Sequence, residues 1–146
     1  MFRGSTVATI DEKGRLKVPT DFRRYLEERF GAEFFVTSVR GDKALVYPLP
    51  VWEEIEARLA GLPVTDPTRQ RFLERVNYFG AQIRLDGQGR LLMPLILREA
   101  VAMQGEVIVT AQIDHLELWN RERFELRLAE QPFTDDDFRA LAERGI

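Results

Sequence analysis

Two short stretches of the chain share the pattern Asp-x-x-Gly-Arg, "DEKGR" at 11–15 and "DGQGR" at 86–90. The glycine permits the positive φ angle of a tight turn. The aspartate can accept hydrogen bonds from turn amides, or hold the arginine in a fork-like pair. An arginine held in this way is a rigid donor for a phosphate or for the O6 and N7 edge of guanine. The pattern therefore predicts two places where the chain can bind nucleic acid.

Each Asp–Arg pair could instead only stabilise its turn. Lys13 and Lys17 surround Arg15 with positive charge, whereas the residues around Arg90, Gln88 among them, are uncharged. The turn-only interpretation is therefore stronger for the second copy than for the first. Gln88 nevertheless has the amide that recognises adenine.

The net charge of −3 argues at first against a nucleic-acid partner. The charge is unevenly distributed, however. Residues 13–24 hold five basic side chains against one acidic, whereas residues 117–146 hold five basic against eight acidic. A solvated mixed surface would be the simplest interpretation of 13–24 alone. Beside the repeated motif, this segment predicts a basic face on an acidic protein.

Other chemistry has little support in the sequence. The chain of 146 residues has no cysteine and one histidine, which argues against disulfides, thiolate ligands and histidine-based metal or triad sites. We expect His115 in a turn, and no catalytic residue, metal, cofactor or small-molecule substrate. Asp11 and Asp86 lack the apolar cleft of a glycosidase acid and base. The longest apolar run, 91–97, is far short of the roughly 20 residues that span a bilayer, so we expect a cytoplasmic protein without membrane contact.

Both motifs lie inside a longer internal repeat with a period of about 75 residues. In the first half we expect a hairpin of strands 7–10 and 15–18, a helix at 20–29 capped by Thr20, a second hairpin of 34–39 and 44–47, and a helix at 51–60. The second half predicts the same order, with strands at 81–85, 90–93, 106–110 and 116–119 and helices at 95–101 and from Arg121. Asp66 and Thr134 are the expected caps of two further helices.

A half of about 60 residues buries too little apolar surface to be stable alone. We therefore expect both halves to share one core in a pseudo-two-fold unit. The expected division is a first repeat at 1–60, a linker and helix at 61–78, a second repeat at 79–130 and a helical tail at 131–146. Trp52, Trp119 and Phe124 are expected in the core or at a subunit interface.

The stretches "MFRG", "DEKGRLKVP..FR", "VYPLPVWEE", "DGQGRLLMP..LR" and "LELW" resemble the MraZ family of bacterial transcriptional regulators, from Met1 to about Arg127. The halves of that family resemble the swapped-hairpin AbrB DNA-binding module. The resemblance implies an α+β fold, an internally duplicated AbrB-like β-barrel with short helices. Departures are Ser5 in place of the usual glutamate, a missing glycine in "VTAQID" and one residue fewer between Gly80 and Asp86 than in the first copy.

The resemblance further implies a sequence-specific regulator of double-stranded promoter DNA, nucleoid-associated, usually a repressor of its own division and cell-wall operon. It implies a ring-shaped homo-oligomer that recognises repeated DNA boxes. The expected DNA contacts are Arg3, Lys13, Gly14, Arg15, Lys17, Gln88 and Arg90, and the expected orienting residues are Asp11, which we expect to be buried, Asp86 and Gly89. A ring-forming scaffold or an antitoxin-like protein-interaction module is the alternative.

Overall fold

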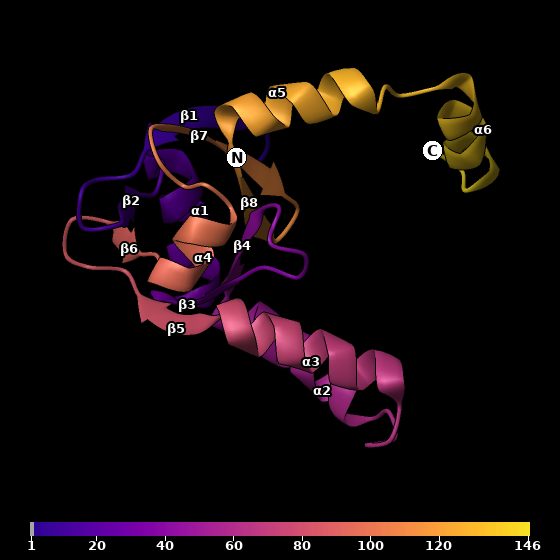
Figure 1. Ribbon diagram of the computed structural model, residues 1–146, viewed down its shortest axis with the longest axis horizontal. Coiled ribbons are helices and arrows are strands. Elements are labelled where there is room, and N and C mark those ends of the chain that lie inside the picture. Colours follow the sequence, from indigo (N-terminus) through magenta and orange to yellow (C-terminus); the bar gives the residue numbers. More distant parts are fainter. Residues whose placement is uncertain (1) are drawn as a thin grey trace.

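The computed structural model describes residues 2–146, which form an α+β fold (Figure 1). The elements of the first half are β1 (Ser5–Thr9), β2 (Arg15–Lys17), α1 (Thr20–Phe30), β3 (Glu33–Thr37), β4 (Ala44–Pro48) and α2 (Leu49–Ala60). After α3 (Pro67–Phe79) come β5 (Ala81–Arg84), β6 (Arg90–Leu92), α4 (Leu95–Ala100), β7 (Glu106–Gln112), β8 (His115–Asn120), α5 (Arg121–Glu130) and α6 (Asp135–Glu143). The expected order of elements is confirmed in both halves.

The strand pairing joins the two halves. Six strands form one antiparallel sheet in the order β1-β7-β8-β4-β3-β5, and β2 pairs with β6 in a separate ribbon. Equivalent strands of the two halves lie at equal distances from opposite edges. β1 and β5 are the two edges, β7 and β3 lie next to them, and β8 and β4 meet in the middle. Among residues 2–146 the recorded pairing leaves β1 and β5 as edges, so the expected closed barrel is not seen.

The expected hairpin of 7–10 and 15–18 is wrong in its pairing. The chain does turn there, but a single bridge between Ile10 and Leu16 is all that joins its two arms. β1 instead pairs with β7, and β2 with β6, so both partners come from the other half. An isolated hairpin of such short strands is marginally stable in water, and pairing with the other half gives each strand an apolar cover.

Leu16 and Leu91 mark the centre of the β2–β6 ribbon. They lie directly opposite each other and are fully buried. The amide of Val18 donates to the carbonyl of Gly89 at 3.0 Å, and the symmetry-related bond is 2.9 Å long. Since Leu16 and Leu91 are 75 residues apart, the pseudo-two-fold relation of the sequence repeat passes through this pair.

The core is one cluster to which both halves contribute. Helix α1 buries Phe22 and Leu26, and α4 buries Leu97. The sheet adds residues such as Phe34 from β3 and Leu118 from β8. The expectation of a shared core is therefore confirmed.

The aromatic residues follow the expected pattern. Trp52 and Trp119 are buried, and Phe124 lies against Trp119 with 5.8 Å between ring centroids. Two cap predictions are confirmed, because Asp66 accepts hydrogen bonds at the start of α3 and Thr134 forms a capping box at the start of α6. The third is wrong: α1 begins after Pro19, and no side chain caps it. The fixed φ of proline already suits a helix start.

His115 differs from its expected place in a turn. It opens β8 and stacks on Tyr47, with 4.2 Å between ring centroids. Burial opposes the charged imidazole, but the nearby carboxylates of Glu117, in an ion pair, and Asp114, in a hydrogen bond, outweigh burial and raise the pKa of His115. The ring therefore belongs to the packing of β4 against β8.

Ile113, in the turn between β7 and β8, has a φ of 70° and is 89% exposed. The matching residue in the turn between β3 and β4 is Gly41, with a φ of 73°. A β-branched residue is strained in this left-handed conformation, whereas glycine is not. The stretch "VTAQID" thus lacks a glycine at the position, Ile113, whose positive φ favours one.

Two helical arms leave the sheet body (Figure 1). Helices α2 and α3 run side by side in one arm, and α5 followed by α6 forms the other. No helix within residues 2–146 is both long and apolar enough to cross a membrane.

Candidate nucleic-acid interface

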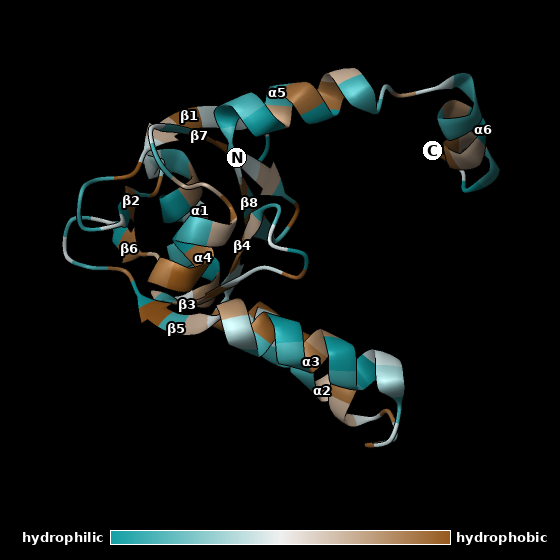
Figure 2. Ribbon diagram, in the orientation of Figure 1, coloured by the Kyte–Doolittle hydropathy of each residue, from teal (hydrophilic) through white to brown (hydrophobic). Residues whose placement is uncertain are grey.

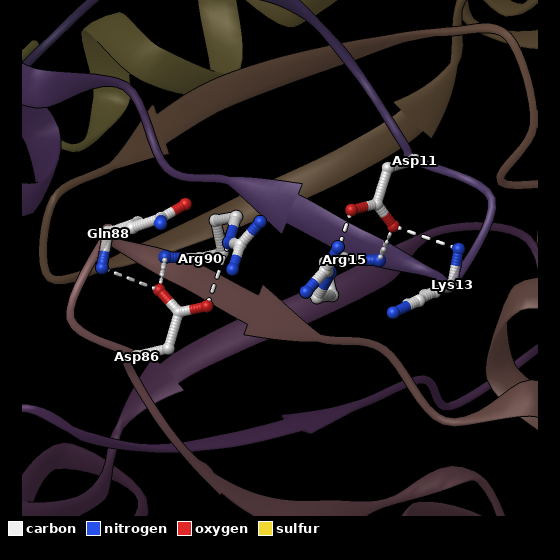
Figure 3. A network of polar contacts seen from close by, with 6 residues as sticks. All are labelled: Asp11, Lys13, Arg15, Asp86, Gln88 and Arg90. Atoms are coloured by element: carbon white, nitrogen blue, oxygen red, sulfur yellow. Dashed lines mark hydrogen bonds and ion pairs between the residues drawn. The ribbon is translucent and has the colours of Figure 1, made fainter.

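The first motif is a turn that holds its own arginine (Figure 3). Gly14 is buried and has a φ of 84°. Asp11 Oδ1 accepts hydrogen bonds from the amides of Lys13 at 3.0 Å and Arg15 at 2.8 Å. Asp11 Oδ2 accepts from Arg15 Nε at 2.7 Å. The carboxylate therefore both closes the turn and orients the guanidinium.

The second motif repeats this geometry almost bond for bond. Asp86 Oδ1 accepts from the amides of Gln88 and Arg90, both at 2.9 Å, and Oδ2 accepts from Arg90 Nε at 2.8 Å. Gly89 is buried with a φ of 74°. The sequence left two roles open for each aspartate, acceptor for the turn amides or partner of the arginine. In both copies the aspartate has both roles.

These hydrogen bonds favour the ionised carboxylates. The pKa of Asp86 is lowered to about 2, chiefly by the hydrogen bond from the amide of Arg90. The pKa of Asp11 is also lowered, chiefly by the hydrogen bond from the amide of Arg15. The expectation that Asp11 is buried is wrong, since 37% of its side chain is exposed, as is 37% of Asp86. Both aspartates are therefore charged at neutral pH while remaining near the surface.

The aspartate occupies one edge of each guanidinium. The bond to Asp11 or Asp86 uses Nε. Within residues 2–146, no hydrogen bond or ion pair engages the terminal nitrogens of Arg15 or Arg90. Each arginine keeps two donor groups on a restrained side chain, which is the geometry that recognises phosphate or guanine.

The ribbon separates its residues by face. Leu16 and Leu91 point into the core, so their neighbours on both strands point outward. The outward residues are Arg15, Lys17, Arg90 and Leu92.

The register then determines which outward residues meet. Lys17 lies directly opposite Arg90, and Arg15 lies opposite Leu92. Like charges directly opposite each other destabilise a strand pair. An anionic ligand across the ribbon would relieve this repulsion, which is an argument for a ligand independent of the turn motif.

Lys13 and Gln88 lie at opposite ends of the ribbon, at the tips of the two turns (Figure 3). Both are exposed. The structure does not bring Arg3 to this ribbon. Arg3 precedes Gly4, whose carbonyl accepts from the amide of Ala111. All of β1 separates it from the first turn, so the expected contacts other than Arg3 share one surface.

Sequence reasoning missed two arginines that support this surface. Arg98 lies against Gly14, and a Cβ at Gly14 would overlap its guanidinium. Arg23 lies in the same way against Gly89. Each half thus packs an arginine on the turn of the other half. The available signal was the repeat itself, which keeps this arginine in register 75 residues apart.

The two supporting arginines differ in their hydrogen bonds. Arg98 Nε donates to the carbonyl of Met93 at 2.9 Å. The buried Nε of Arg23 makes no hydrogen bond within residues 2–146, and the Glu27 carboxylate is 4.0 Å away. The first turn, which presents Arg15, therefore has the better-anchored cover.

No group of three or more metal-ligating side chains occurs in the part of the chain that the structure describes.

An internally duplicated α+β chain whose halves share a basic two-stranded ribbon is the class that the fold and site define. The family model described as "MraZ protein, putative antitoxin-like" matches residues 1–75 and 80–145. Proteins named transcriptional regulator MraZ from Acidobacterium capsulatum and Koribacter versatilis are each 45% identical to the chain, over the full length of both sequences. The protein of that name from Escherichia coli is 35% identical over 131 residues, 89% of this chain and 86% of the relative. The chain belongs to the MraZ family.

Proposed function

We propose that the chain is a sequence-specific regulator of transcription that reads double-stranded DNA with the β2–β6 ribbon. The observation that carries the proposal is the pair of arginines, Arg15 and Arg90. Each is held at Nε by its aspartate, and its terminal nitrogens make no hydrogen bond or ion pair within residues 2–146. The relatives' name, transcriptional regulator, supports it.

The ribbon has the shape and charge that the major groove accepts. A two-stranded ribbon fits the groove, and an arginine fork there matches the acceptors of guanine. Lys17 beside Arg90 adds attraction for phosphates. The restraint by Asp11 and Asp86 means that little side-chain freedom is lost on binding.

The wider role follows from the family resemblance. We propose a cytoplasmic, nucleoid-associated repressor of its own division and cell-wall operon, built from two AbrB-like swapped-hairpin repeats at 1–60 and 79–130 and needing no cofactor. One ribbon makes few phosphate contacts and binds weakly. A ring-shaped homo-oligomer that places several ribbons on repeated boxes gains affinity through multivalency.

The test is binding to a fluorescent duplex from the region upstream of the protein's own gene, measured by anisotropy across a salt series. We expect affinity to fall steeply with salt and a scrambled duplex to bind more weakly. The control variant is Arg58→Ala, which removes an exposed arginine of α2 outside the ribbon and outside the basic segment 13–24. Failure to bind the duplex even at low salt would refute the proposal.

A second candidate, the scaffold or antitoxin-like module, has support in the family description. In that case the outward arginines would contact acidic groups of a protein partner. The same anisotropy series separates the two functions. A protein-interaction module would show no preference between the upstream duplex and the scrambled one.

A further inference from the structure

Helix α6 is an amphipathic element that buries none of its residues within the part of the chain that the structure describes. Thr134 and Asp137 form a capping box at its start, and Phe133 packs on Phe138 with 4.7 Å between ring centroids. This is the arrangement of a hydrophobic staple. Phe133 and Phe138 are still about 60% exposed, and α6 lies apart from the sheet body (Figures 1 and 2). A helix of nine residues is marginal in water alone, so its apolar face calls for a partner.

The other arm has a groove with an apolar floor. It lies along α3, has a volume of about 930 Å³ and contains the aromatic residues Phe72, Tyr78 and Phe79. Tyr78 is 64% exposed, so this floor is also uncovered. The exposed aromatic residues of this floor are an apolar surface on which Phe133 and Phe138 can become buried.

The charges of the two surfaces are complementary. Three arginines, Arg40, Arg71 and Arg75, line the groove with a single glutamate, Glu74. The first turn of α6 consists of three aspartates, 135–137. Apolar contact and opposite charge therefore coincide at both surfaces.

The groove that receives α6 cannot easily be that of the same chain. Three residues, 131–133, separate the end of α5 from Thr134, and they span at most roughly 11 Å. Helix α5 packs on β7 and β8, whereas α3 packs on β3 near the other edge of the sheet. Figure 1 shows α6 at a distance from α3. A second copy of the chain can offer its groove without this restriction.

We infer that α6 of one copy docks into the α3 groove of a second copy, with Phe133 and Phe138 on the aromatic floor and the aspartates beside Arg71 and Arg75. This inference rests on the proposed homo-oligomer and names its interface. The arm and the groove are different surfaces of one chain, so the contact is head-to-tail. Contacts of this kind generate rings when the rotation closes.

The test uses full-length variants and measures mass by size-exclusion chromatography with light scattering. Arg71→Glu places a negative charge in the groove, and Phe138→Glu places one on the apolar face of α6. We expect each to weaken self-association at least tenfold. The matched control is Arg58→Glu, which reverses an exposed arginine of α2 outside the groove and should leave the mass unchanged. Asp135→Lys tests the charge while retaining the capping box.

Mixing the two defective variants is the decisive step. The Arg71→Glu protein keeps a normal α6, and the Phe138→Glu protein keeps a normal groove. A head-to-tail contact therefore predicts one-to-one pairs in the mixture, although each variant alone self-associates at least tenfold more weakly than the wild type.

Wild-type oligomers that persist in both variants would overturn the inference while leaving the proposed oligomer in place. A wild-type chain that stays monomeric at all concentrations would overturn both. Preference for the upstream duplex over the scrambled one is measured separately, so that failure of the interface is distinguishable from failure of the proposed DNA reading.

Discussion

The guanidinium of Arg98 lies directly against Gly14, so that the turn presenting Arg15 is covered by a side chain from the other half of the molecule. Arg23 covers Gly89 in the same way. The duplicated arginine and the duplicated glycine thus meet across the pseudo-two-fold axis. This relationship explains why both halves have the glycine and the arginine. Only a residue without a Cβ leaves room in the turn for the arginine of the other half.

Gly14→Ala should destabilise the protein. The added methyl group would force strain at a φ of 84° and overlap Arg98, and we expect a loss of about 1–3 kcal/mol in the free energy of unfolding. The measurement is urea denaturation. Gly87→Ala is the control, because that glycine has open space and no positive φ, and alanine there should be neutral or slightly stabilising. Equal effects at both positions would contradict this account of Gly14.

Ile113→Gly should stabilise the protein. Ile113 is almost fully exposed and adopts a left-handed conformation, so its side chain contributes strain without burial. Relief of that strain should add about 1 kcal/mol to the free energy of unfolding. Thermal denaturation checks the sign. A lower melting temperature would show that the side chain of Ile113 has contacts that outweigh the strain.

Asp11→Asn should separate the two tasks of Asp11. Asparagine still offers one oxygen to the amides of Lys13 and Arg15, but it loses the charge that holds Arg15 Nε. We expect melting to fall less than in Asp11→Ala, and we expect roughly three- to tenfold weaker DNA binding. Asp11→Ala, which also removes the amide acceptor, should lower both melting and affinity. If Asp11→Asn binds DNA as well as the wild type, the aspartate only closes the turn.

The Asp–Arg pairs should resist acid. In the unfolded chain an aspartate has its ordinary pKa of 3.8, whereas the folded pKa of Asp86 is about 2 and that of Asp11 is also lowered. Their contribution to stability is therefore fully present above about pH 4 and is lost as the pH falls toward 2. The difference in unfolding free energy between wild type and Asp86→Asn should be constant from pH 5 to 7 and shrink below pH 4. A difference that disappears between pH 5 and 6 would be inconsistent with these pKa values.

Arg15→Ala should cost more DNA affinity than Arg90→Ala. Arg15 has Lys13 at the tip of its own turn, and Arg98 anchors that turn through Met93, whereas the cover of the second turn lacks this bond. Loss of a bidentate base contact costs about 1–3 kcal/mol. Promoter affinity across a salt series, with oligomer mass checked in parallel, measures both variants. A larger loss from Arg90→Ala with intact assembly would assign the reading role to the second half.

The local patterns of the sequence were sufficient for much of this protein. Periodicity and turn residues predicted the order of elements, the internal repeat and the caps at Asp66 and Thr134. The Asp-x-x-Gly-Arg pattern also predicted both kinds of partner for each aspartate, turn amides and the arginine, although as alternatives. It could do so because every atom involved lies within five consecutive residues. Interactions of such short range depend little on the remainder of the chain.

Tertiary structure alone decided which strands pair and what covers each turn. Nothing local distinguishes a hairpin of β1 with β2 from the observed pairing of β2 with β6, since the same alternation of apolar and polar residues serves both. The choice follows from burial of Leu16 against Leu91, two residues 75 positions apart. The same long-range packing places Lys17 opposite Arg90 and Arg98 on Gly14, and it leaves Arg3 away from the ribbon. Sequence thus determined the parts of the ribbon, and the packing of one half on the other determined how they form one surface.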